Sequence, residues 1–235
     1  MINAGENDVF PWIKSVCLIT ALLSATPAAW AGVVVGGTRV VYDSNKREAS
    51  ISVRNPEKTA PYLIQSWVEN AQTSDTRKTP FIITPPLFRL DPGQENVLRI
   101  VRTGGQLPDD KESLFWLNIK SIPASEKTDK NQLQISVKTR IKLMYRPAGL
   151  RGNAAEAYKA LTFTRQGNQL RVSNPTPYYI AFYSVKVGSQ EIKEAGTVEP
   201  MNTRSWTLPA GAGNAVSWQA INDYGGITPA EQAAL

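Results

Sequence analysis

Apolar and polar side chains alternate along much of this chain, and the longest alternating run spans residues 132–146. Its apolar members share one parity and its polar members the other, which predicts a β-strand with one buried face. At about 3.3 Å per residue the run extends for roughly 40 Å, about twice the length of a usual strand. The strand is therefore longer than one sandwich core requires. Its apolar members are Leu133, Ile135, Val137, Ile141, Leu143 and Tyr145.

Shorter alternating runs recur every 10–15 residues and are separated by Pro, Gly and Asn, which is typical of an all-β sandwich. The first half contains seven such runs, the strand number of an immunoglobulin-like domain, and the second half repeats the scheme. We expect strands at 39–43, 48–55, 62–70, 81–85, 96–103, 113–123 and 132–146, and then at 160–165, 169–174, 178–187, 204–209 and 215–223.

Two local similarities between the halves indicate a duplicated fold. Residues 53–67 and 172–185 each read as a strand, an Asn-Pro turn and an aromatic-led strand, and 90–100 resembles 198–208. Pro and Gly interrupt the alternation near 146–154, so we expect two domains, residues 32–148 and 149–235. A short helix is expected at 153–161, and the tail 227–235 is expected to be loosely attached.

The N-terminus is expected to be a signal peptide, residues 1–31. An apolar run at 15–25 follows Lys14, and the small residues Ala29 and Ala31 are typical of a cleavage site after Ala31. The run is short for a membrane span, so the sequence predicts an exported protein rather than an integral membrane protein.

The composition excludes several kinds of chemistry. The chain has no histidine, and its one cysteine, Cys17, lies in the leader. Thiol nucleophiles, Cys/His zinc sites and histidine bases are thereby excluded, so we expect no catalytic residue, no metal and no cofactor. The net charge is +6, and +7 once the leader's Glu6, Asp8 and Lys14 are removed. Because basic residues are scattered among acidic ones, the sequence does not predict a nucleic-acid-binding surface.

Residues 107–123, LPDDKESLFWLNIKSIP, closely resemble the signature of the PapD-like pilus-assembly chaperones that work with outer-membrane ushers in the periplasm. Residues 84–93, 141–147, 174–179 and 221–226 resemble further segments of that family. The resemblance implies two immunoglobulin-like domains set at an angle like a boomerang, with a cleft between them. It also implies that the last strand of the first domain is lent to a pilus subunit that lacks a strand. The segment 124–132 is short, as in the subgroup that assembles rod-like pili.

The resemblance assigns roles to particular residues. Arg39 and Lys142 resemble the two cleft cations that bind the subunit's terminal carboxylate. A planar guanidinium and a mobile ammonium suit that ligand, although Arg140 shares the parity of Lys142 and remains a further candidate. The residues expected to fill the subunit's groove are Leu133, Ile135 and Val137, and those expected to form an interdomain salt bridge are Glu112, Arg146 and Asp223.

An apolar strand left unoccupied is an aggregation hazard, which suggests a self-capping dimer as the resting state. Two other functions remain open from the residues alone. A secreted structural or adhesin-type protein of a pilus system would also be a β-sandwich, but such subunits usually carry a cysteine pair. A sugar-binding module or enzyme would use exposed tryptophans, whereas the alternating strands favour core positions for Trp67, Trp116, Trp206 and Trp218.

Overall fold

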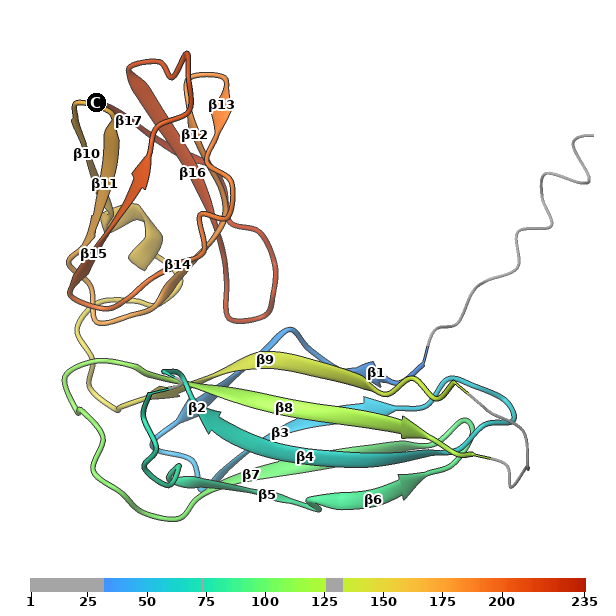
Figure 1. Ribbon diagram of the computed structural model, residues 1–235. Helices are drawn as coiled ribbons and strands as arrows, with labels where there is room; N and C mark the ends of the chain where they lie inside the picture. The colour runs from blue at the N-terminus through green and yellow to red at the C-terminus, as the bar shows by residue number, and fades with distance from the viewer. Residues whose placement is uncertain (1–31, 73, 126–132) are drawn as a thin grey trace, which may run out of the picture. The chain divides into compact units, whose positions relative to one another are not determined.

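The computed structural model describes residues 32–72, 74–125 and 133–235, which fold almost entirely as β-strands (Figure 1). The strands form two sandwiches, each with its own hydrophobic core. The predicted signal peptide, residues 1–31, lies outside the described residues, as does Gln132 at the start of the predicted long strand. The part of the chain that the structure describes contains no helix with the length and apolar character needed to cross a membrane.

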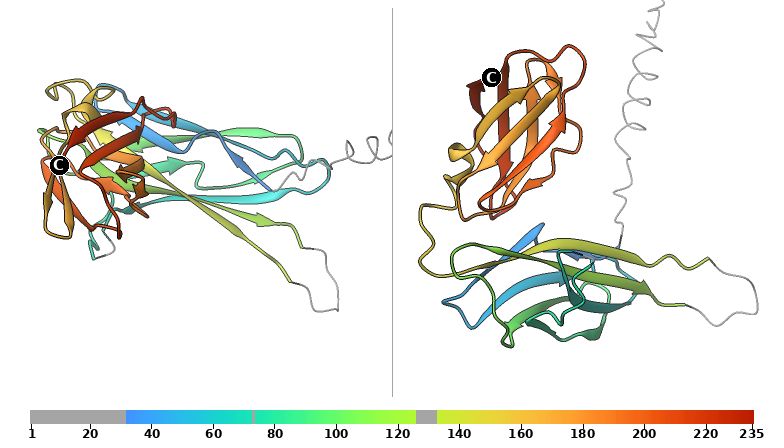
Figure 2. Two further views of the ribbon diagram at one scale, coloured as in Figure 1. Left: turned by 90° about the horizontal axis from the view of Figure 1, so that it is seen from above. Right: turned by 60° about the vertical axis from the view of Figure 1, so that its left-hand side comes forward.

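The first sandwich packs two sheets face to face (Figures 1 and 2). The chain passes from one sheet to the other between β1 and β2 at Gly36, where a Cβ atom would collide with the side chain of Ser52. One sheet has the order β1-β3-β7-β5, with β1 at Val34–Val35, β3 at Glu48–Arg54, β7 at Glu95–Arg102 and β5 at Phe81–Thr84. The other has the order β2-β9-β8-β4-β6, with β2 at Arg39–Asp43, β9 at Val137–Arg146, β8 at Ser113–Pro123, β4 at Tyr62–Asn70 and β6 at Leu87–Leu90.

The core of the first sandwich follows the alternation of its strands. Leu98, Leu117 and Leu143, from three different strands, are each fully buried. The rings of Tyr42, Phe81, Phe115 and Tyr145 pack together in this core with centroids 5.0–6.2 Å apart, in two edge-to-face pairs and two tilted pairs. Burying one face of each strand in this way leaves the alternate, polar residues on the outer face of each sheet.

The second sandwich begins after a single 3₁₀ turn, η1, at Ala157–Ala160. Trp206 and Trp218 lie in its core, so these two tryptophans are not available to stack on a sugar. One sheet has the order β10-β11-β15, with β10 at Thr162–Gln166, β11 at Gln169–Asn174 and β15 at Asn202–Thr207. The other has the order β13-β12-β16-β17, with β14 also paired to β12; the bounds are β13 at Gln190–Glu191, β12 at Ile180–Val187, β14 at Thr197–Val198, β16 at Ala215–Ile221 and β17 at Glu231–Ala234.

The two sandwiches use the same asparagine-centred turn. Asn55 donates Nδ2 to the carbonyls of Ala60 and Leu90, at 2.8 and 3.2 Å, and accepts the amide of Glu57. In the second sandwich Asn174 donates Nδ2 to two carbonyls at 2.8 and 2.9 Å, and it accepts the amide two residues ahead. Both asparagines are buried. The Asn-Pro similarity seen in the sequence is therefore a shared hydrogen-bonded structure.

Three sequence predictions were wrong. The strand expected at 132–146 begins only at Val137, because its pairing with β8 ends at Ser121 and residues 133–136 pair with no described strand. The tail expected to be loosely attached contains β17, which pairs antiparallel with β16. Trp67 and Trp116, for which core positions were favoured, lie instead on the outer face of their sheet and are only partly buried. The short helix expected at 153–161 is present as the 3₁₀ turn η1. The peptide bond Thr84-Pro85 is cis.

Candidate functional site

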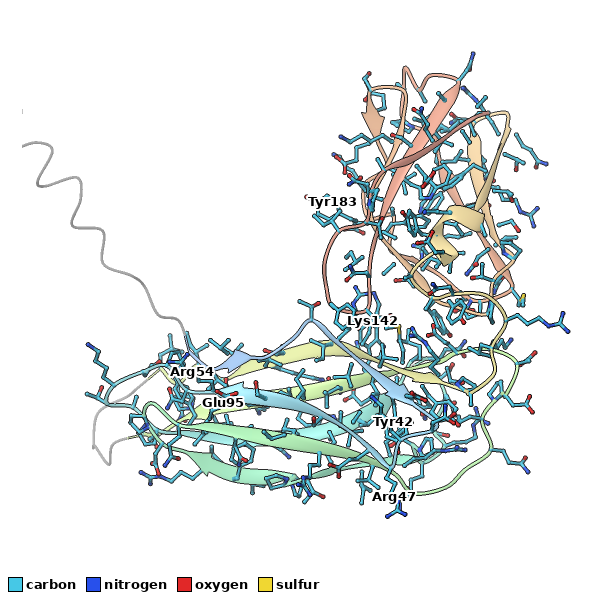
Figure 3. The ribbon with its side chains drawn as sticks, turned by 180° about the vertical axis from the view of Figure 1, so that it is seen from behind. Tyr42, Arg47, Arg54, Glu95, Lys142 and Tyr183 are labelled. Carbon is cyan, nitrogen blue, oxygen red and sulfur yellow. The ribbon has the colours of Figure 1, made fainter. Side chains whose placement is uncertain are left out.

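Two cations lie side by side where β2 meets β9. These strands pair in parallel, and Arg39 stands opposite Lys142 in the register. Val40 and Leu143, the next residues along each strand, point into the core, so the two cations lie on the outer face of the sheet. Lys142 and the core residue Tyr42 lie on opposite faces of this sheet (Figure 3). The strand pairing thus brings together two residues that are far apart in the sequence.

The environment of this pair disfavours its positive charge. Burial lowers the pKa of Lys142, and the neighbouring Arg39 lowers it further. Burial also lowers the pKa of Arg39, although the charge of Asp223 counteracts this. Arg39 donates Nη1 to the carbonyl of Ile221 at 2.9 Å, and its buried Nε has no hydrogen-bond partner. Within the described residues neither cation forms an ion pair, so the pair is suited to bind an anion.

Arg140, the further candidate for the anchor, is already occupied. Its guanidinium lies 4.3 Å from the centroid of the Trp116 ring and 3.7 Å from the carboxylate of Glu69. Lys142 has no such carboxylate partner among the described residues. The geometry therefore separates the two cations that the sequence could not distinguish, and it leaves Lys142 as the one available to a ligand.

The apolar residues of the long run divide into two groups. Ile141, Leu143 and Tyr145 are buried in the first sandwich. In contrast, Leu133 is 89% exposed, Ile135 67% and Val137 56%. These three residues have the same parity as the buried ones, but they lie at or beyond the start of β9, where the sandwich has no core to cover them.

One edge of β9 is open next to these exposed residues. On one side β8 pairs with β9 from Val137 to Tyr145. On the other side β2 pairs only with Lys142 to Arg146. The stretch from Val137 to Ile141 therefore has no described strand on its second side, and its backbone groups there are free to pair with another strand.

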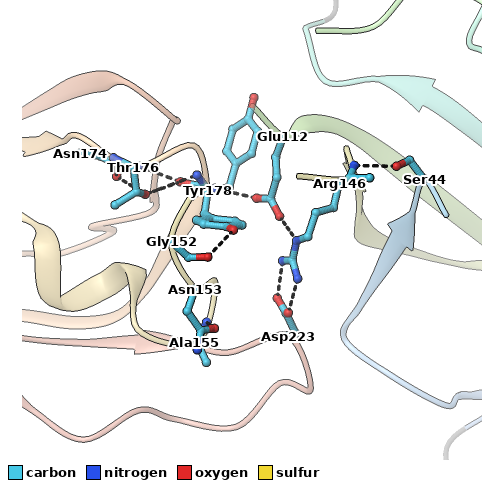
Figure 4. A network of polar contacts seen from close by, with 12 residues as sticks. Ser44, Glu112, Arg146, Gly152, Asn153, Ala155, Asn174, Thr176, Tyr178 and Asp223 are labelled. Carbon is cyan, nitrogen blue, oxygen red and sulfur yellow. Dashed lines mark hydrogen bonds and ion pairs between the residues drawn. The ribbon is translucent and has the colours of Figure 1, made fainter. Parts of the chain in front are cut away.

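Arg146, four residues beyond Lys142 on β9, is the centre of an ion network (Figure 4). Its Nε donates to Glu112 Oε1 at 2.6 Å, and its two Nη atoms donate to the two oxygens of Asp223 at 2.7 and 2.9 Å. The other oxygen of Glu112 accepts the backbone amide of Tyr179 at 2.8 Å. The network thus joins β9 and the segment before β8 to two segments of the second sandwich.

Burial sets the charges in this network. The pKa of Glu112 is raised because the loss of water outweighs the attraction of Arg146. The two carboxylates hold the pKa of Arg146 above its ordinary value in spite of its own burial, so this guanidinium stays positive. The network is a partly buried joint with charged hydrogen bonds at every contact, which favours one definite geometry over alternatives.

The structure adds contacts that the sequence did not predict. The carbonyl of Ile221 binds Arg39, and the amide of Tyr179 binds Glu112. Both are backbone groups, which every residue has, so no residue type marks them. Glu69 and Trp116 could have been found from the sequence. Each alternates with the core residues of its strand and therefore lies on the same face of the sheet as the cations of β9. No cluster of three or more potential metal ligands occurs among residues 32–72, 74–125 and 133–235.

Comparison with known protein families gives two matches that together span most of the chain. Residues 32–151 match the family described as pili and flagellar-assembly chaperone, PapD N-terminal domain. Residues 156–232 match the family described as pili assembly chaperone PapD, C-terminal domain. The chain is also 49% identical over 216 residues to the probable fimbrial chaperone LpfB of Escherichia coli O157:H7, covering 90% of this chain and 92% of the relative.

Solved structures give the same result. The chain is similar, with a TM-score of 0.80 and 35% identity, to a chain in the structure of the Salmonella enterica SafA pilin in complex with the SafB chaperone, covering 89% of this chain and 99% of that one. It is similar, with a TM-score of 0.72 and 37% identity, to the periplasmic chaperone SfaE, covering 87% and 100%. These similarities confirm the predicted all-β fold of two immunoglobulin-like domains.

Proposed function

The chain belongs to the family of pilus-assembly chaperones, and we propose that it holds a pilus subunit by lending it the first half of β9. As a member of that family it is a chaperone and not an enzyme. Its relatives are named as chaperones, so no observation favours the alternative of a structural or adhesin-type pilus protein.

The open edge of β9 supports strand addition. A subunit strand pairing with residues 137–141 would satisfy the free backbone groups on that side. Leu133, Ile135 and Val137 would then fill the groove that a missing strand leaves in the subunit's own sandwich. Full burial of such a side chain is worth about 1.5–3 kcal/mol of transfer free energy. Their present exposure means that most of this free energy is still available for binding.

The paired cations supply the fixed end of the interaction. We assign Arg39 and Lys142 to the terminal carboxylate of the subunit, since its negative charge would offset the burial and the repulsion by Arg39 that lower the pKa of Lys142. From Lys142 to Val137 the strand extends about 17 Å. A carboxylate bound at Lys142 therefore sets the register in which Val137 and Ile135 meet the subunit. A slip of one residue would present Ser136 and Lys138 to the groove instead.

The Arg146 network and Arg39 bind the same segment of the second sandwich, so the network supports the position of the anchor. Arg39 is held by the carbonyl of Ile221 in the second sandwich, and Asp223 of the same segment binds Arg146. We assign to Glu112, Arg146 and Asp223 the role of keeping this segment against the first sandwich. The anchor then depends on both sandwiches, although its two cations belong to one.

Location and further partners follow from the family. We infer that the chain is exported to the periplasm and that its signal peptide is cleaved after Ala31. The similar chaperone SfaE is named as periplasmic, which supports this location. We also infer delivery of the subunit to an outer-membrane usher, which co-purification with the usher would test. The exposed Leu133 and Ile135 favour a self-capping dimer of the free chaperone, and sedimentation showing a monomer at all concentrations would contradict it.

The single observation that carries the proposal is the pair of Arg39 on β2 and Lys142 on β9, which has no ion-pair partner among the described residues, while β9 also has an open edge next to exposed apolar residues. Arg39→Ala and Lys142→Ala test it by co-expression with the pilus subunits encoded beside the chaperone. Each charged hydrogen bond is worth about 1.5–3 kcal/mol, so each change should reduce the co-purified subunit roughly 10- to 100-fold.

The exposed Lys186, in the second sandwich, provides a matched control as Lys186→Ala. The thermal unfolding temperature of the free Lys142→Ala variant should not be lower than that of the wild type, because the environment of Lys142 already disfavours its ammonium charge. Unchanged recovery of subunit with both anchor variants would contradict the assignment.

A further inference from the structure

The first half of β9 must keep its strand geometry with a neighbour on one side only. Beyond Ile141 the strand is held by β2 and β8 together, whereas from Val137 to Ile141 it has β8 alone. A strand held at one edge is free to twist or fray before a partner arrives. The side chains on its outer face are therefore of interest, because they are the other means of holding it.

Two cations of this half-strand lie on tryptophan rings. Lys138 Nζ is 5.0 Å from the centroid of the Trp67 ring, and the Arg140 guanidinium is 4.3 Å from that of Trp116. Trp116 belongs to the adjacent strand β8, but Trp67 belongs to β4, one strand further away. The Lys138 side chain thus reaches past β8 to the strand beyond, which Figure 1 shows on its far side.

Glu69 of β4 connects both cations. Its carboxylate lies 3.5 Å from Lys138 Nζ and 3.7 Å from Arg140 Nη2, and it accepts a 2.8 Å hydrogen bond from the indole of Trp67. The indole hydrogen bond, and then the two cations, lower the pKa of Glu69. We call these five residues the outer-face cluster: Trp67, Glu69, Trp116, Lys138 and Arg140.

The cluster is packed rather than loosely solvated. Asn118 of β8 stands between Trp67 and Arg140 in the strand register and shares their face of the sheet. An outward-facing asparagine is ordinarily wet, yet Asn118 is fully buried. The neighbouring side chains of the cluster must cover it, and they therefore form a continuous layer across three strands.

The cluster lies on the face of β9 opposite to the residues assigned to the subunit's groove. Lys138 and Arg140 have the opposite parity to Ile135 and Val137, so they do not enter that groove. Removing the cluster would leave the groove-filling residues and the anchor cations intact. Any effect on capture would then arise from the geometry of β9.

We propose that the outer-face cluster positions the first half of β9, holding it extended and correctly twisted before the subunit arrives. Ordering this segment in advance lowers the conformational cost of strand addition and speeds productive encounter. The five residues are positioning residues, and the inference rests on the proposed function of β9 as the lent strand.

Glu69→Gln and Arg140→Gln test the proposal, and Arg140→Lys is the conservative variant. Glu69→Gln keeps an acceptor for Trp67 but removes the charge that joins the two cations. The control is Glu48→Gln, because Glu48 is similarly exposed and forms an ion pair with Arg99 at 3.8 Å on the other sheet. Hydrogen exchange of the amides of residues 137–141 is measured in the free chaperone. Association is then measured with subunit released by guanidinium chloride from the purified wild-type complex.

We expect faster exchange at residues 137–141 and association about tenfold slower in both Gln variants, corresponding to about 1.4 kcal/mol. Arg140→Lys should restore part of the exchange protection and part of the association rate, and Glu48→Gln should match the wild type in both. The inference would be overturned if the Gln variants had the same amide exchange rates as Glu48→Gln. It would also be overturned if their amides exchanged faster but their association rate with the subunit were that of the wild type. Failure of the wild type itself to bind subunit would instead overturn the proposed function, while the exchange result would still decide whether the cluster orders β9.

Discussion

Two glutamates of the first sandwich are placed in opposite electrostatic environments. Glu69 lies on the outer face of the sheet between a hydrogen-bond donor and two cations, and its pKa is lowered. Glu112 is buried beside Arg146, and its pKa is raised because desolvation is the larger effect. The same residue type thus holds a strand at the surface in one case and a joint in the interior in the other.

Titration of the carboxyl carbons by NMR should show this difference. Glu69 should titrate below the usual glutamate value of 4.5, and Glu112 above it. The contribution of Glu69 to stability is then present above pH 4.5 and lost as the pH falls through its lowered pKa. That of Glu112 has the opposite sign: it is present below pH 4.5 and lost as the pH rises through its raised pKa.

Arg140→Gln provides the control for this titration, since it should bring the midpoint of Glu69 closer to 4.5 and leave that of Glu112 unchanged. Equal midpoints for the two glutamates in the wild type would contradict the environments described here.

At the residue scale the sequence allowed part of the site to be predicted. Parity alone places Lys142 on the polar face of its strand, and the family resemblance pairs it with Arg39. Parity does not separate Lys142 from Arg140, because that difference depends on Glu69 and Trp116 on other strands. The contacts made by the backbone of Ile221 and Tyr179 have no counterpart in residue type and could not be predicted.

Among the structural elements, the turns at Asn55 and Asn174 show the duplication most clearly. Each side chain joins its own turn to a distant one, through the carbonyls of Leu90 and Glu199 respectively. Leu90 directly precedes Asp91-Pro92 and Glu199 directly precedes Pro200, within the segments 90–100 and 198–208 that are similar in sequence. One buried amide therefore ties together two turns in each sandwich.

Asn55→Ala and Asn174→Ala should each destabilise the protein by about 2–4 kcal/mol. Each change removes two donated hydrogen bonds and leaves buried carbonyls without a partner. Guanidinium unfolding would measure the loss. Asn45→Ala is the control, because Asn45 is an exposed turn residue. A loss below about 0.5 kcal/mol, the usual range for surface substitutions, would show that these turns do not depend on the asparagines.

Strands that show a clear alternation were predicted well and very short strands were missed, for a physical reason. The bounds of β4 and β8 agree with the sequence prediction because both strands are paired on two sides and alternate throughout. The two-residue strands β1, β13 and β14 are too short to show a period, and β17 has only one neighbour. The start of β9 was placed too early because alternation continues past the last pairing partner.

For the whole molecule, the arrangement matters more than any one strand. Exposed apolar residues lie at and before the start of β9, the proposed anchor cation Lys142 lies in its middle and Arg146 lies at its end. Arg146 and Arg39 both bind the segment around Asp223 in the second sandwich. We therefore expect changes in that segment to alter the position of Arg39, so that the proposed function would depend on both sandwiches.

At this scale the sequence was informative about organisation and uninformative about contacts. Alternation and the internal similarity were enough to predict two sandwiches. The partners of Arg146 could be named only through the family resemblance, because ion pairs between distant segments depend on tertiary structure. The outer-face cluster spans three strands and emerged only once their register was known.

The central claim is that Ile135 is exposed in the free chaperone and buried in the captured subunit. Beyond residue 31 the chain has no cysteine, so Ile135→Cys provides a single thiol whose reaction rate with a soluble maleimide reports its accessibility. Ser50→Cys, at an exposed position on the other sheet, is the reference. The account predicts that complex formation slows the reaction at position 135 by about 100-fold or more and leaves position 50 unchanged, as expected for a fully buried strand residue. Equal reaction rates at position 135 in the free chaperone and in the complex would contradict it.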